Sequence, residues 1–397
     1  MKQDLEQFVL ENFQSALEKR HIQPYYQPVI RTISQKLCSF EALARWVDPE
    51  RGVIRPDQFI PVLERAKLIH LLDECIIHQV CERLRRSMDS AQVPIPVSVN
   101  LSRQDFQLCD VYAMVDKLTR SHQIPHEFLY IEITESSMSE QEELMHSIVD
   151  RFHTGGYQVW MDDFGSAYSS LNTLKDYTFD ELKLDMRFLS SFSQRSRRIL
   201  TAVVHMAKEI NVHTLAEGVE NEDQFRYLRN IGCEKVQGYF FGRPLPYEES
   251  LEHLCATGIR IETPQERKYY DDIGRVNLLS AVPFITREEH DALTSARQLN
   301  SIPLALVEMD ESHFKLLFHN TAFEQTAQGT GLFPDVFDVR LMGTPQPAAL
   351  LSEKFRRLLD ATRSGEPGKM YLISREEYYE VQAKCVSQLG ERYCVLL

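Results

Sequence analysis

Apolar residues in the first part of the chain fall into short, β-rich runs that alternate with longer stretches of helical periodicity. Residues 1–20 form a charged, amphipathic stretch that predicts a helix. The apolar runs at 25–30 and 37–46 predict two strands, and the polar residues 34–36 between them predict a turn. The sheet is therefore expected to begin with an antiparallel hairpin.

Six further strands follow the hairpin and alternate with helices. The predicted strands lie at residues 95–100, 128–134, 157–162, 181–184, 212–216 and 235–239. The clearest helical patterns lie at residues 71–86, 141–152, 196–209 and 222–230. Repeated strand–helix alternation favours a mainly parallel sheet. This number of units predicts an α/β fold, a modified TIM (β/α)8 barrel opened by the antiparallel hairpin.

The pattern changes after Pro246. A final helix is predicted at 247–258, a charged connection at 263–272 and a further helix at 287–299. From residue 302 the pattern predicts two strands and a short helix. Strand-like runs close the chain at residues 369–374, 378–387 and 392–397. We therefore predict three parts: a barrel over 1–257, a helical linker over 258–299 and a smaller α+β domain over 300–397.

Composition and charge argue against some classes of binding partner. The chain has 397 residues, of which 43% are hydrophobic and 26% charged, with a formal net charge of −14. This charge argues against binding to duplex nucleic acid or to an anionic membrane through a broad basic face. A small phosphate-bearing ligand stays compatible, because metal ions can supply positive charge locally. The eight cysteines form no C-x-x-C pair, and no membrane span or secretory signal is apparent, so a cytoplasmic location is expected.

Polar residues stand at or near the carboxyl ends of the predicted parallel strands. They are Asn100, Glu132, Asp162, Lys183, Glu217 and Gln237. These strand ends converge on one mouth of a barrel, where active sites are built. Glu41, inside the opening hairpin, can point into the same space. A single acid at a strand end is most often a helix cap or a loop residue, but this many in succession predict a functional site.

The side chains of this group suit a hard metal ion. Carboxylate and amide oxygens are the ligands that Mg²⁺ or Mn²⁺ prefers. The candidate ligands are Glu41, Asn100, Glu132, Asp162, Asp163 and Glu217. Two such ions about 3.5–4 Å apart form a clamp for phosphodiester cleavage. Lys183 could hold the attacking water or the phosphate, and Arg45 could make a forked phosphate contact or pair with Glu41.

The ordered segments resemble the EAL-domain family of cyclic di-GMP phosphodiesterases. The motif that names the family stands here as Glu41-Ala42-Leu43, followed by Ala44-Arg45-Trp46. The other matching segments lie at residues 26–30, 98–102, 132–136, 162–165, 182–185, 216–220, 237–240 and 243–246. The resemblance extends from about residue 8 to residue 246. It implies a homodimeric, metal-dependent enzyme that opens cyclic di-GMP to linear pGpG with two Mg²⁺ or Mn²⁺ ions per active site.

The resemblance also implies a role for each site residue. The ligands of the first ion would be Glu41, Asn100, Glu132 and Asp162. Those of the second would be Asp162, Asp163 and Glu217. Lys183 would assist the nucleophile, and Gln237 would steady the water network at the mouth. Gln27 would contact a guanine and Arg45 a phosphate, while Glu135 would anchor the loop that follows the two aspartates.

Two departures from the family pattern bear on activity. Ala167 stands where the family usually has glycine, and a residue with a Cβ resists positive φ, so lower activity or altered coupling to dimerisation is expected. Met186 stands where the family often has arginine, which puts a peripheral substrate contact in question. The alternatives are a degenerate barrel that binds cyclic di-GMP or a protein without cleavage, and a hydrolase of another phosphodiester.

The C-terminal region faintly resembles a PAS sensor domain. The resemblance rests on the strand pair around residues 302–319, the segment Asn320-Thr321-Ala322-Phe323 and the three closing strands. It implies a regulatory domain that takes an unidentified small ligand or partner. An unrelated α+β appendage that only packs or dimerises is the alternative.

Overall fold

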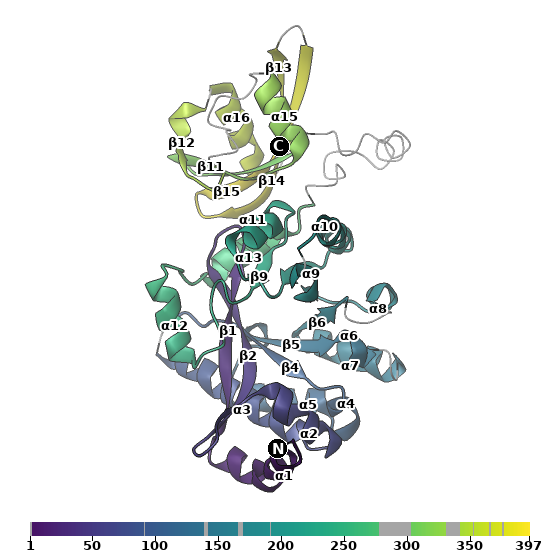
Figure 1. Ribbon diagram of the computed structural model, residues 1–397. Helices are drawn as coiled ribbons and strands as arrows, with labels where there is room; N and C mark the ends of the chain where they lie inside the picture. The colour runs from purple at the N-terminus through teal and green to yellow at the C-terminus, as the bar shows by residue number, and fades with distance from the viewer. Residues whose placement is uncertain are drawn as a thin grey trace. The chain divides into compact units, whose positions relative to one another are not determined.

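The chain divides into two compact units (Figure 1). The computed structural model describes residues 2–90, 92–138, 142–165, 170–190, 192–277, 303–330, 342–351, 353–364, 367–374 and 377–397. The first unit comprises Met1–Leu200, Val212–Leu228 and Cys233–Glu262, and the second comprises Thr201–Asn211, Arg229–Gly232 and Thr263–Leu397. The predicted helix at 287–299 and the predicted effect of Ala167 lie outside the described residues.

Eight strands close into a barrel in the first unit, which confirms the predicted fold class. They are β1 (Ile22–Arg31), β2 (Leu37–Asp48), β4 (Val97–Leu101), β5 (Leu129–Thr134), β6 (Gln158–Phe164), β7 (Glu181–Leu184), β8 (His213–Ala216) and β9 (Lys235–Gln237). From β2 through β4 to β9 each strand is parallel to the next. β1 is antiparallel to both of its neighbours, β2 and β9, and so closes the ring. The short β3 (Gly52–Ile54) pairs with β2 outside the ring.

Helices surround the barrel and bury apolar faces against it. They include α1 (Lys2–Glu18), α2 (Pro56–Arg65), α3 (Ile69–Asp89), α5 (Val111–Ser121), α7 (Glu142–Thr154), α11 (Glu222–Asn230) and α12 (Tyr247–Ala256). Helix α10 (Gln194–Glu209) is divided between the two units after Leu200. The short helices α4 (Asp105–Leu108), α6 (Glu135–Met138), α8 (Ser170–Asp176) and α9 (Arg187–Ser190) lie in the connections. The sequence did not predict α2, in which Pro61 interrupts an otherwise helical pattern, or α5.

The barrel interior is layered because alternate residues of a strand point to the same side. One buried apolar layer consists of Val29, Cys38, Tyr130, Trp160 and Leu215. The tyrosine and tryptophan rings of this layer stack with centroids 4.7 Å apart. Glu132, Asp162 and Glu217 each lie two residues after a member of this layer, namely Tyr130, Trp160 and Leu215. Strand alternation therefore places a dry apolar floor beneath the predicted site.

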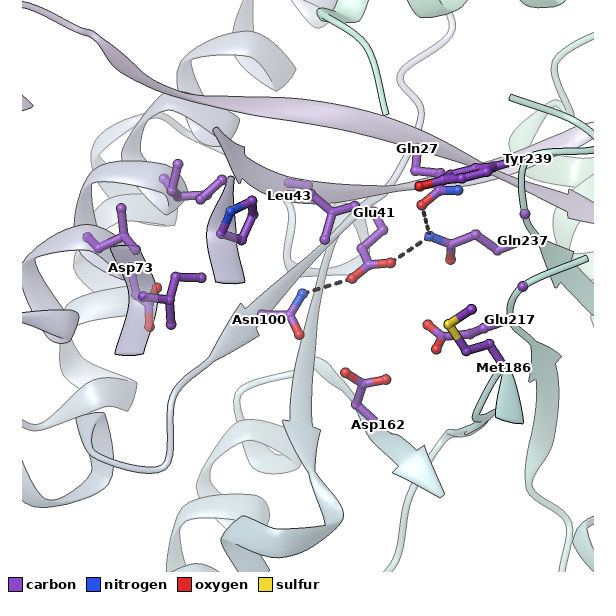
Figure 2. Close-up of a pocket in the computed structure, with 18 of the residues that line it drawn as sticks. Gln27, Glu41, Leu43, Asp73, Asn100, Asp162, Met186, Glu217, Gln237 and Tyr239 are labelled. Atoms are coloured by element: carbon purple, nitrogen blue, oxygen red, sulfur yellow. Dashed lines mark hydrogen bonds between the residues drawn. The ribbon is translucent and has the colours of Figure 1, made fainter. Parts of the chain in front are cut away.

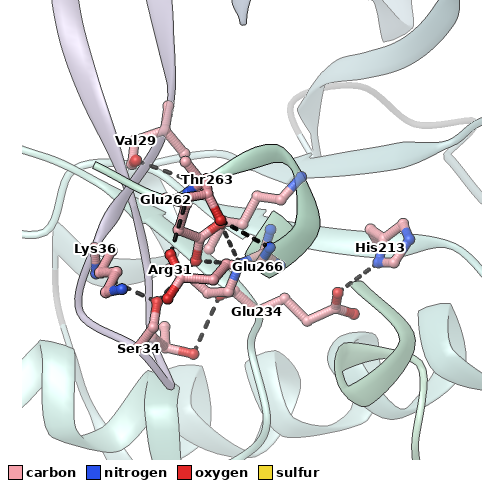
Figure 3. A network of polar contacts seen from close by, with 12 residues as sticks. Val29, Arg31, Ser34, Lys36, His213, Glu234, Glu262, Thr263 and Glu266 are labelled. Atoms are coloured by element: carbon pink, nitrogen blue, oxygen red, sulfur yellow. Dashed lines mark hydrogen bonds and ion pairs between the residues drawn. The ribbon is translucent and has the colours of Figure 1, made fainter. Parts of the chain in front are cut away.

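A buried polar network fastens the segment after α12 to the opening hairpin (Figure 3). Nε of Arg31 donates to both carboxylate oxygens of Glu262, at 2.8 and 3.1 Å, and Oγ of Ser34 donates to Oε1 at 2.8 Å. Arg31 and Glu262 are both fully buried. The backbone N–H of Glu262 also donates to the carbonyl of Leu37 at 2.9 Å. Removing either charge would therefore break a fully buried ion pair.

The second unit contains α13 (Pro264–Gly274) and an antiparallel sheet in the order β12-β11-β10-β15-β14-β13. The strands are β10 (Ala305–Met309), β11 (His313–His319), β12 (Gln346–Pro347), β13 (Gly368–Ser374), β14 (Glu377–Leu389) and β15 (Arg392–Leu396). Helices α15 (Thr321–Thr330) and α16 (Glu353–Ala361) contribute Phe323, Phe355 and Leu358 to the core of this sheet. The second, antiparallel sheet was predicted, whereas α16 and β12 were not. The PAS-like assignment and the domain boundaries stay predictions.

Two general expectations concern the whole chain. All eight cysteines lie in described ranges, and each is a free thiol. Across the ranges that the structure describes, no helix combines the length and the apolar character needed to cross a membrane.

We predict that Glu262→Gln lowers the free energy of unfolding of the barrel by about 3–5 kcal/mol, because it breaks a fully buried ion pair with Arg31. Denaturant unfolding followed by tryptophan fluorescence measures this, since both tryptophans, Trp46 and Trp160, are buried in the barrel.

The matched control is Glu222→Gln, which removes an exposed ion pair with Arg226 and should cost less than about 1 kcal/mol. A loss below about 1 kcal/mol for Glu262→Gln as well would contradict the importance of the buried network.

Candidate active site

Lys183 lies at the centre of the candidate site. Its side chain, in β7, is buried, and its Nζ lies close to four carboxylates that come from different strands. The distances from Nζ are 2.6 Å to Glu132, 2.9 Å to Glu217, 3.0 Å to Asp162 and 3.5 Å to Glu41. Parallel strands of a closed barrel bring their carboxyl ends to one place, so residues distant in sequence meet here.

Three amide side chains continue the cluster on the β1–β2–β9 side (Figure 2). Nδ2 of Asn100 donates to Oε1 of Glu41 at 2.9 Å, and Nε2 of Gln237 donates to Oε2 of Glu41 at 2.6 Å. Gln237 also donates to Oε1 of Gln27 at 3.0 Å. In the strand register, Gln27 stands opposite Glu41 and Asn100 stands opposite Glu132, so these side chains reach the same end of the barrel. The Glu41 carboxylate is therefore held at both oxygens.

A β-bulge brings both aspartates of β6 to the site. The pairing of β6 with β7 shifts register between Met161 and Phe164, and Asp163 adopts a φ of 59°. Adjacent residues of a regular strand point to opposite faces, but a bulge with a left-handed residue re-aims a side chain. Three carboxylate oxygens, one from each of Asp162, Asp163 and Glu217, lie within 4.8 Å of one another. Left-handed backbone in a non-glycine residue is costly and is often retained at functional sites.

Glu135 begins α6 and contacts the loop that follows the two aspartates. Its Oε2 accepts a hydrogen bond from the backbone N–H of Gly165 at 3.2 Å. Gly165 has a φ of 91°, and a Cβ there would come within 2.4 Å of the Phe188 ring. The anchoring role of Glu135 stays a prediction, because residues 166–169 of the loop lie outside the described residues.

Arg45 is the predicted site residue that lies apart from this group. Its Nη1 donates to the carbonyl of Ala44 at 2.8 Å, and its guanidinium lies 5.9 Å from the centroid of the Tyr25 ring. Arg45 makes no ion pair with Glu41, and it is not among the residues that line the cavity. Its contact with a phosphate stays a prediction.

A cavity of about 480 Å³ opens at the acidic cluster. Its polar wall includes Gln27, Glu41, Asn100, Asp162, Glu217 and Gln237 (Figure 2). Met186 and Tyr239 line it as well. The opposite wall, which was not predicted from the sequence, consists of Leu43, Pro56, Ile60, Leu72, Asp73 and Ile76. Most of this wall comes from α2 and α3, whose residues carry no distinctive motif.

Burial and mutual repulsion set the charge of the cluster. Burial, with help from Asp162, raises the pKa of Asp163 to about 6. Burial raises the pKa of Glu217 to about 8, against the attraction of Lys183. Burial also raises the pKa of Glu132 well above its usual range. For Glu41, burial is outweighed by the Lys183 ammonium and by the Gln237 hydrogen bond, so its pKa is lowered.

The positive charge present is too small for all of these acids to ionise. Burial disfavours the ammonium, but the surrounding carboxylates raise the pKa of Lys183 well above its usual value. If Glu41, Glu132, Asp162, Asp163 and Glu217 are all ionised, one ammonium leaves a deficit of four positive charges. Two divalent cations would balance this deficit.

The donor set fits a hard divalent ion. Oε1 of Glu132 is buried and has no hydrogen-bond partner, and the neighbouring donors are carboxylate and amide oxygens. A second group, His78, Glu82 and His122, also has ligand-type atoms within 4.8 Å of one another. There, however, both carboxylate oxygens of Glu82 already accept hydrogen bonds from Arg20, each at 2.9 Å. The cluster around Lys183 is therefore the stronger candidate metal site.

Comparison with known proteins identifies relatives of the barrel. The family model of the EAL domain matches residues 10–244. The bifunctional diguanylate cyclase/cyclic di-GMP phosphodiesterase MucR of Pseudomonas aeruginosa is 32% identical over 249 residues, which are 62% of this chain and 36% of MucR. The cyclic di-GMP phosphodiesterase NbdA of the same organism is 32% identical over 248 residues, 62% of this chain and 32% of NbdA. The chain thus spans about a third of the length of these curated relatives.

A solved structure matches the same part of the chain. The structure described as the PaMucR phosphodiesterase in complex with c-di-GMP has a TM-score of 0.58 and 32% identity, and the match covers 61% of this chain and 98% of that one. The matched region is the barrel, and it contains every residue of the cluster around Lys183.

We predict that Mn²⁺ or Mg²⁺ at about 100 times its dissociation constant raises the melting temperature of the barrel by about 5–10 °C, because a ligand of the folded state stabilises it by mass action. Asp162→Asn should remove most of this rise by removing a shared ligand. Thermal unfolding followed by tryptophan fluorescence, with metal and with chelator, measures both effects.

Asp223→Asn, which alters an exposed acid at the start of α11, is the control and should keep the full rise. Equal metal responses in the Asp162→Asn variant and in the unchanged chain would show that the ion binds elsewhere.

Proposed function

Since this chain belongs to the EAL domain family, we propose that its barrel is a metal-dependent phosphodiesterase that hydrolyses cyclic di-GMP to linear pGpG. The observation that carries the proposal is the set of oxygen ligands gathered around the Lys183 ammonium at the mouth of the barrel. MucR and NbdA are named as cyclic di-GMP phosphodiesterases, which supports the same substrate.

We assign two Mg²⁺ or Mn²⁺ ions to the cluster. Glu41, Asn100, Glu132 and Asp162 would hold one ion, and Asp162, Asp163 and Glu217 the other. When bound, such ions supply Lewis-acid chemistry, which lowers the pKa of a water molecule and neutralises negative charge on the phosphate. The deficit of positive charge in the cluster and the unpartnered Oε1 of Glu132 support this assignment.

The residues of the chain have distinct tasks in the proposed reaction. Lys183 would hold the attacking water or the phosphate next to the carboxylates. Glu217, which lies 2.9 Å from Nζ of Lys183, would hold or orient the second ion together with its water. Gln237 and Gln27 would position the substrate and the water around Glu41, and Arg45 would reach a phosphate after a change of rotamer. Glu135 would hold the loop after β6 in place.

The reaction balances as the addition of one water molecule. A new bond forms between the water oxygen and phosphorus, and the bond between phosphorus and the 3′ oxygen breaks. The 3′ oxygen leaves with a proton, so the ring opens to a linear dinucleotide with a 5′ phosphate. Enclosure of the site at the mouth of the barrel holds the phosphate in line with the attacking water, which reduces the entropic cost of the reaction.

The rest of the chain would regulate this activity. We propose that residues 300–397 form a PAS-like regulatory domain that takes an unidentified ligand or partner, with residues 258–299 as the linker. The sheet and the helices α15 and α16 support an independently packed module, because they share a core of their own. We also propose that the enzyme acts as a homodimer in the cytoplasm.

We predict that the purified chain converts cyclic di-GMP to pGpG with Mg²⁺ or Mn²⁺ and that a chelator abolishes the conversion. Glu41→Gln should lower kcat by at least about 100-fold, because it removes a negative ligand from the centre of the hydrogen-bonded cluster. Chromatography of the reaction products measures both effects.

Glu222→Gln, at an exposed position on α11, is the matched control and should retain activity. Measurable binding of cyclic di-GMP without any product, in both metals, would overturn the catalytic proposal. That result would support the alternative, a degenerate barrel that serves as a cyclic di-GMP receptor or protein-interaction module.

A further inference from the structure

Two histidines and a glutamate of the barrel unit meet away from the cavity. His78 and Glu82 stand four residues apart on α3, and His122 directly follows α5, which packs beside α3 (Figure 1). Residues four apart lie on one face of a helix. Ligand-type atoms of the three residues lie within 4.8 Å of one another, and none of the three lines the cavity. Since an α-helix rises about 1.5 Å per residue, Glu82 lies about 13.5 Å further along α3 than Asp73, which does border the cavity.

The imidazole of His122 has the tautomer that a metal ligand needs. Its Nδ1 lies 2.9 Å from the carbonyl oxygen of Leu118, and a carbonyl can only accept, so Nδ1 carries the proton in the neutral ring. The lone pair is then on Nε2, for which the described part of the chain records no hydrogen bond. Histidines that bind metal ions almost always donate their other ring N–H to a carbonyl, a carboxylate or water. His122 therefore has both the free nitrogen and the outer contact of a metal ligand.

The chain around His122 is held against α3. The backbone N–H of His122 donates to the carbonyl of Leu118 at 3.2 Å, which ends α5 at this point. Nη1 of Arg85, on α3, donates to the carbonyl of Gln123 at 3.3 Å, and Ile124 is buried. The backbone that carries His122 is thus already fixed beside α3. A ligand set that is fixed before binding loses less conformational entropy when an ion binds.

His78 is the adjustable member of the group. Its side chain is 42% exposed, and its Nδ1 lies 3.8 Å from Oε1 of Glu82, too far for a hydrogen bond. Within the described ranges, neither ring nitrogen of His78 has a hydrogen-bond partner. The rings of His78 and His122 meet edge to face with centroids 4.9 Å apart. Ligand atoms of a tetrahedral zinc site, with bonds of about 2.0–2.1 Å, lie about 3.3 Å apart, so a small rotation of His78 would complete the set.

Glu82 supplies the negative charge of the group. Its hydrogen bonds with Arg20 lower the pKa of Glu82, so the carboxylate is ionised at neutral pH. The two hydrogen bonds from Arg20, each at 2.9 Å, occupy one acceptor site on each oxygen. A carboxylate offers about four such sites. Two therefore stay open to an ion, while Arg20 orients the carboxylate from the outside, as outer hydrogen-bond partners of ligating carboxylates do.

We propose that His78, Glu82 and His122 form a metal site, separate from the acidic cluster, that takes Zn²⁺ or a similar divalent transition-metal ion. Imidazole nitrogen suits Zn²⁺, whereas Mg²⁺ prefers a site made of oxygen ligands. Three protein ligands leave a fourth position for water. The bound ion would clamp the end of α5 to α3. The inference does not depend on the proposed function, because it concerns binding outside the cavity.

The test is a Zn²⁺ titration of the untagged chain in excess Mg²⁺, in competition with a chromogenic zinc chelator. It gives the number of Zn²⁺ ions bound and their dissociation constants. The double variant His78→Gln/His122→Gln should bind one Zn²⁺ fewer than the unchanged chain. His122→Gln alone should weaken binding at this site by at least about 10-fold, since even loss of an outer partner of a metal ligand costs about 10- to 100-fold.

The matched control is His313→Gln, which alters an exposed histidine of the second unit. It should keep the number of Zn²⁺ ions and their affinities. Comparison of the variants with the unchanged chain cancels any Zn²⁺ held by the free cysteines or by the cluster around Lys183. The same number of ions, bound with the same affinities, in the double variant and in the unchanged chain would overturn the inference.

A direct measurement keeps the test decisive if the double variant does not fold. Crystals of the unchanged chain, soaked with Zn²⁺ and Mg²⁺, are measured at the zinc absorption edge. An anomalous difference peak between His78, Glu82 and His122 would support the site. Absence of a peak at this position, whether or not zinc is found elsewhere, would overturn it.

Discussion

The site depends on one buried ammonium group that holds several carboxylates together. Lys183 touches acids that come from β2, β5, β6 and the segment after β8, and no two neighbouring strands could supply them all. Such a cluster requires a closed ring, in which the carboxyl ends of all strands meet. Closure is visible at the seam, where Gln27 of β1, Gln237 of β9 and Glu41 of β2 are joined by hydrogen bonds. The barrel and the cluster therefore form together.

Regular strand geometry alone would not complete the cluster. Asp162 and Asp163 are neighbours in sequence, and a flat strand would send them to opposite faces. The bulge in β6 and the positive φ of Asp163 place both near Glu217. The glycine that follows Gln237 is similarly constrained, because a Cβ on Gly238 would come within 2.1 Å of the carbonyl oxygen of Val219. Local strain and a close backbone approach thus position the side chains that the strands deliver.

The sequence predicted the parts of the molecule that follow from periodicity. Alternating strands and helices predicted the barrel, and polar residues at strand ends predicted the cluster around Lys183. Features that depend on tertiary contacts were not accessible. Asp73 lies on α3, and helical periodicity does not reveal that it borders the cavity. The contact between Arg31 and Glu262 spans 231 positions, and the rotamer of Arg45 depends on Tyr25 and Ala44.

The buried ion pairs of the barrel differ from the candidate site in their balance of positive and negative charge. Arg31 and Glu262 form a pair of one cation and one anion, and so do Lys235 and Glu181 in the barrel interior. Each of these pairs brings one positive and one negative charge. The cluster around Lys183 has an excess of anions, which calls for added cations.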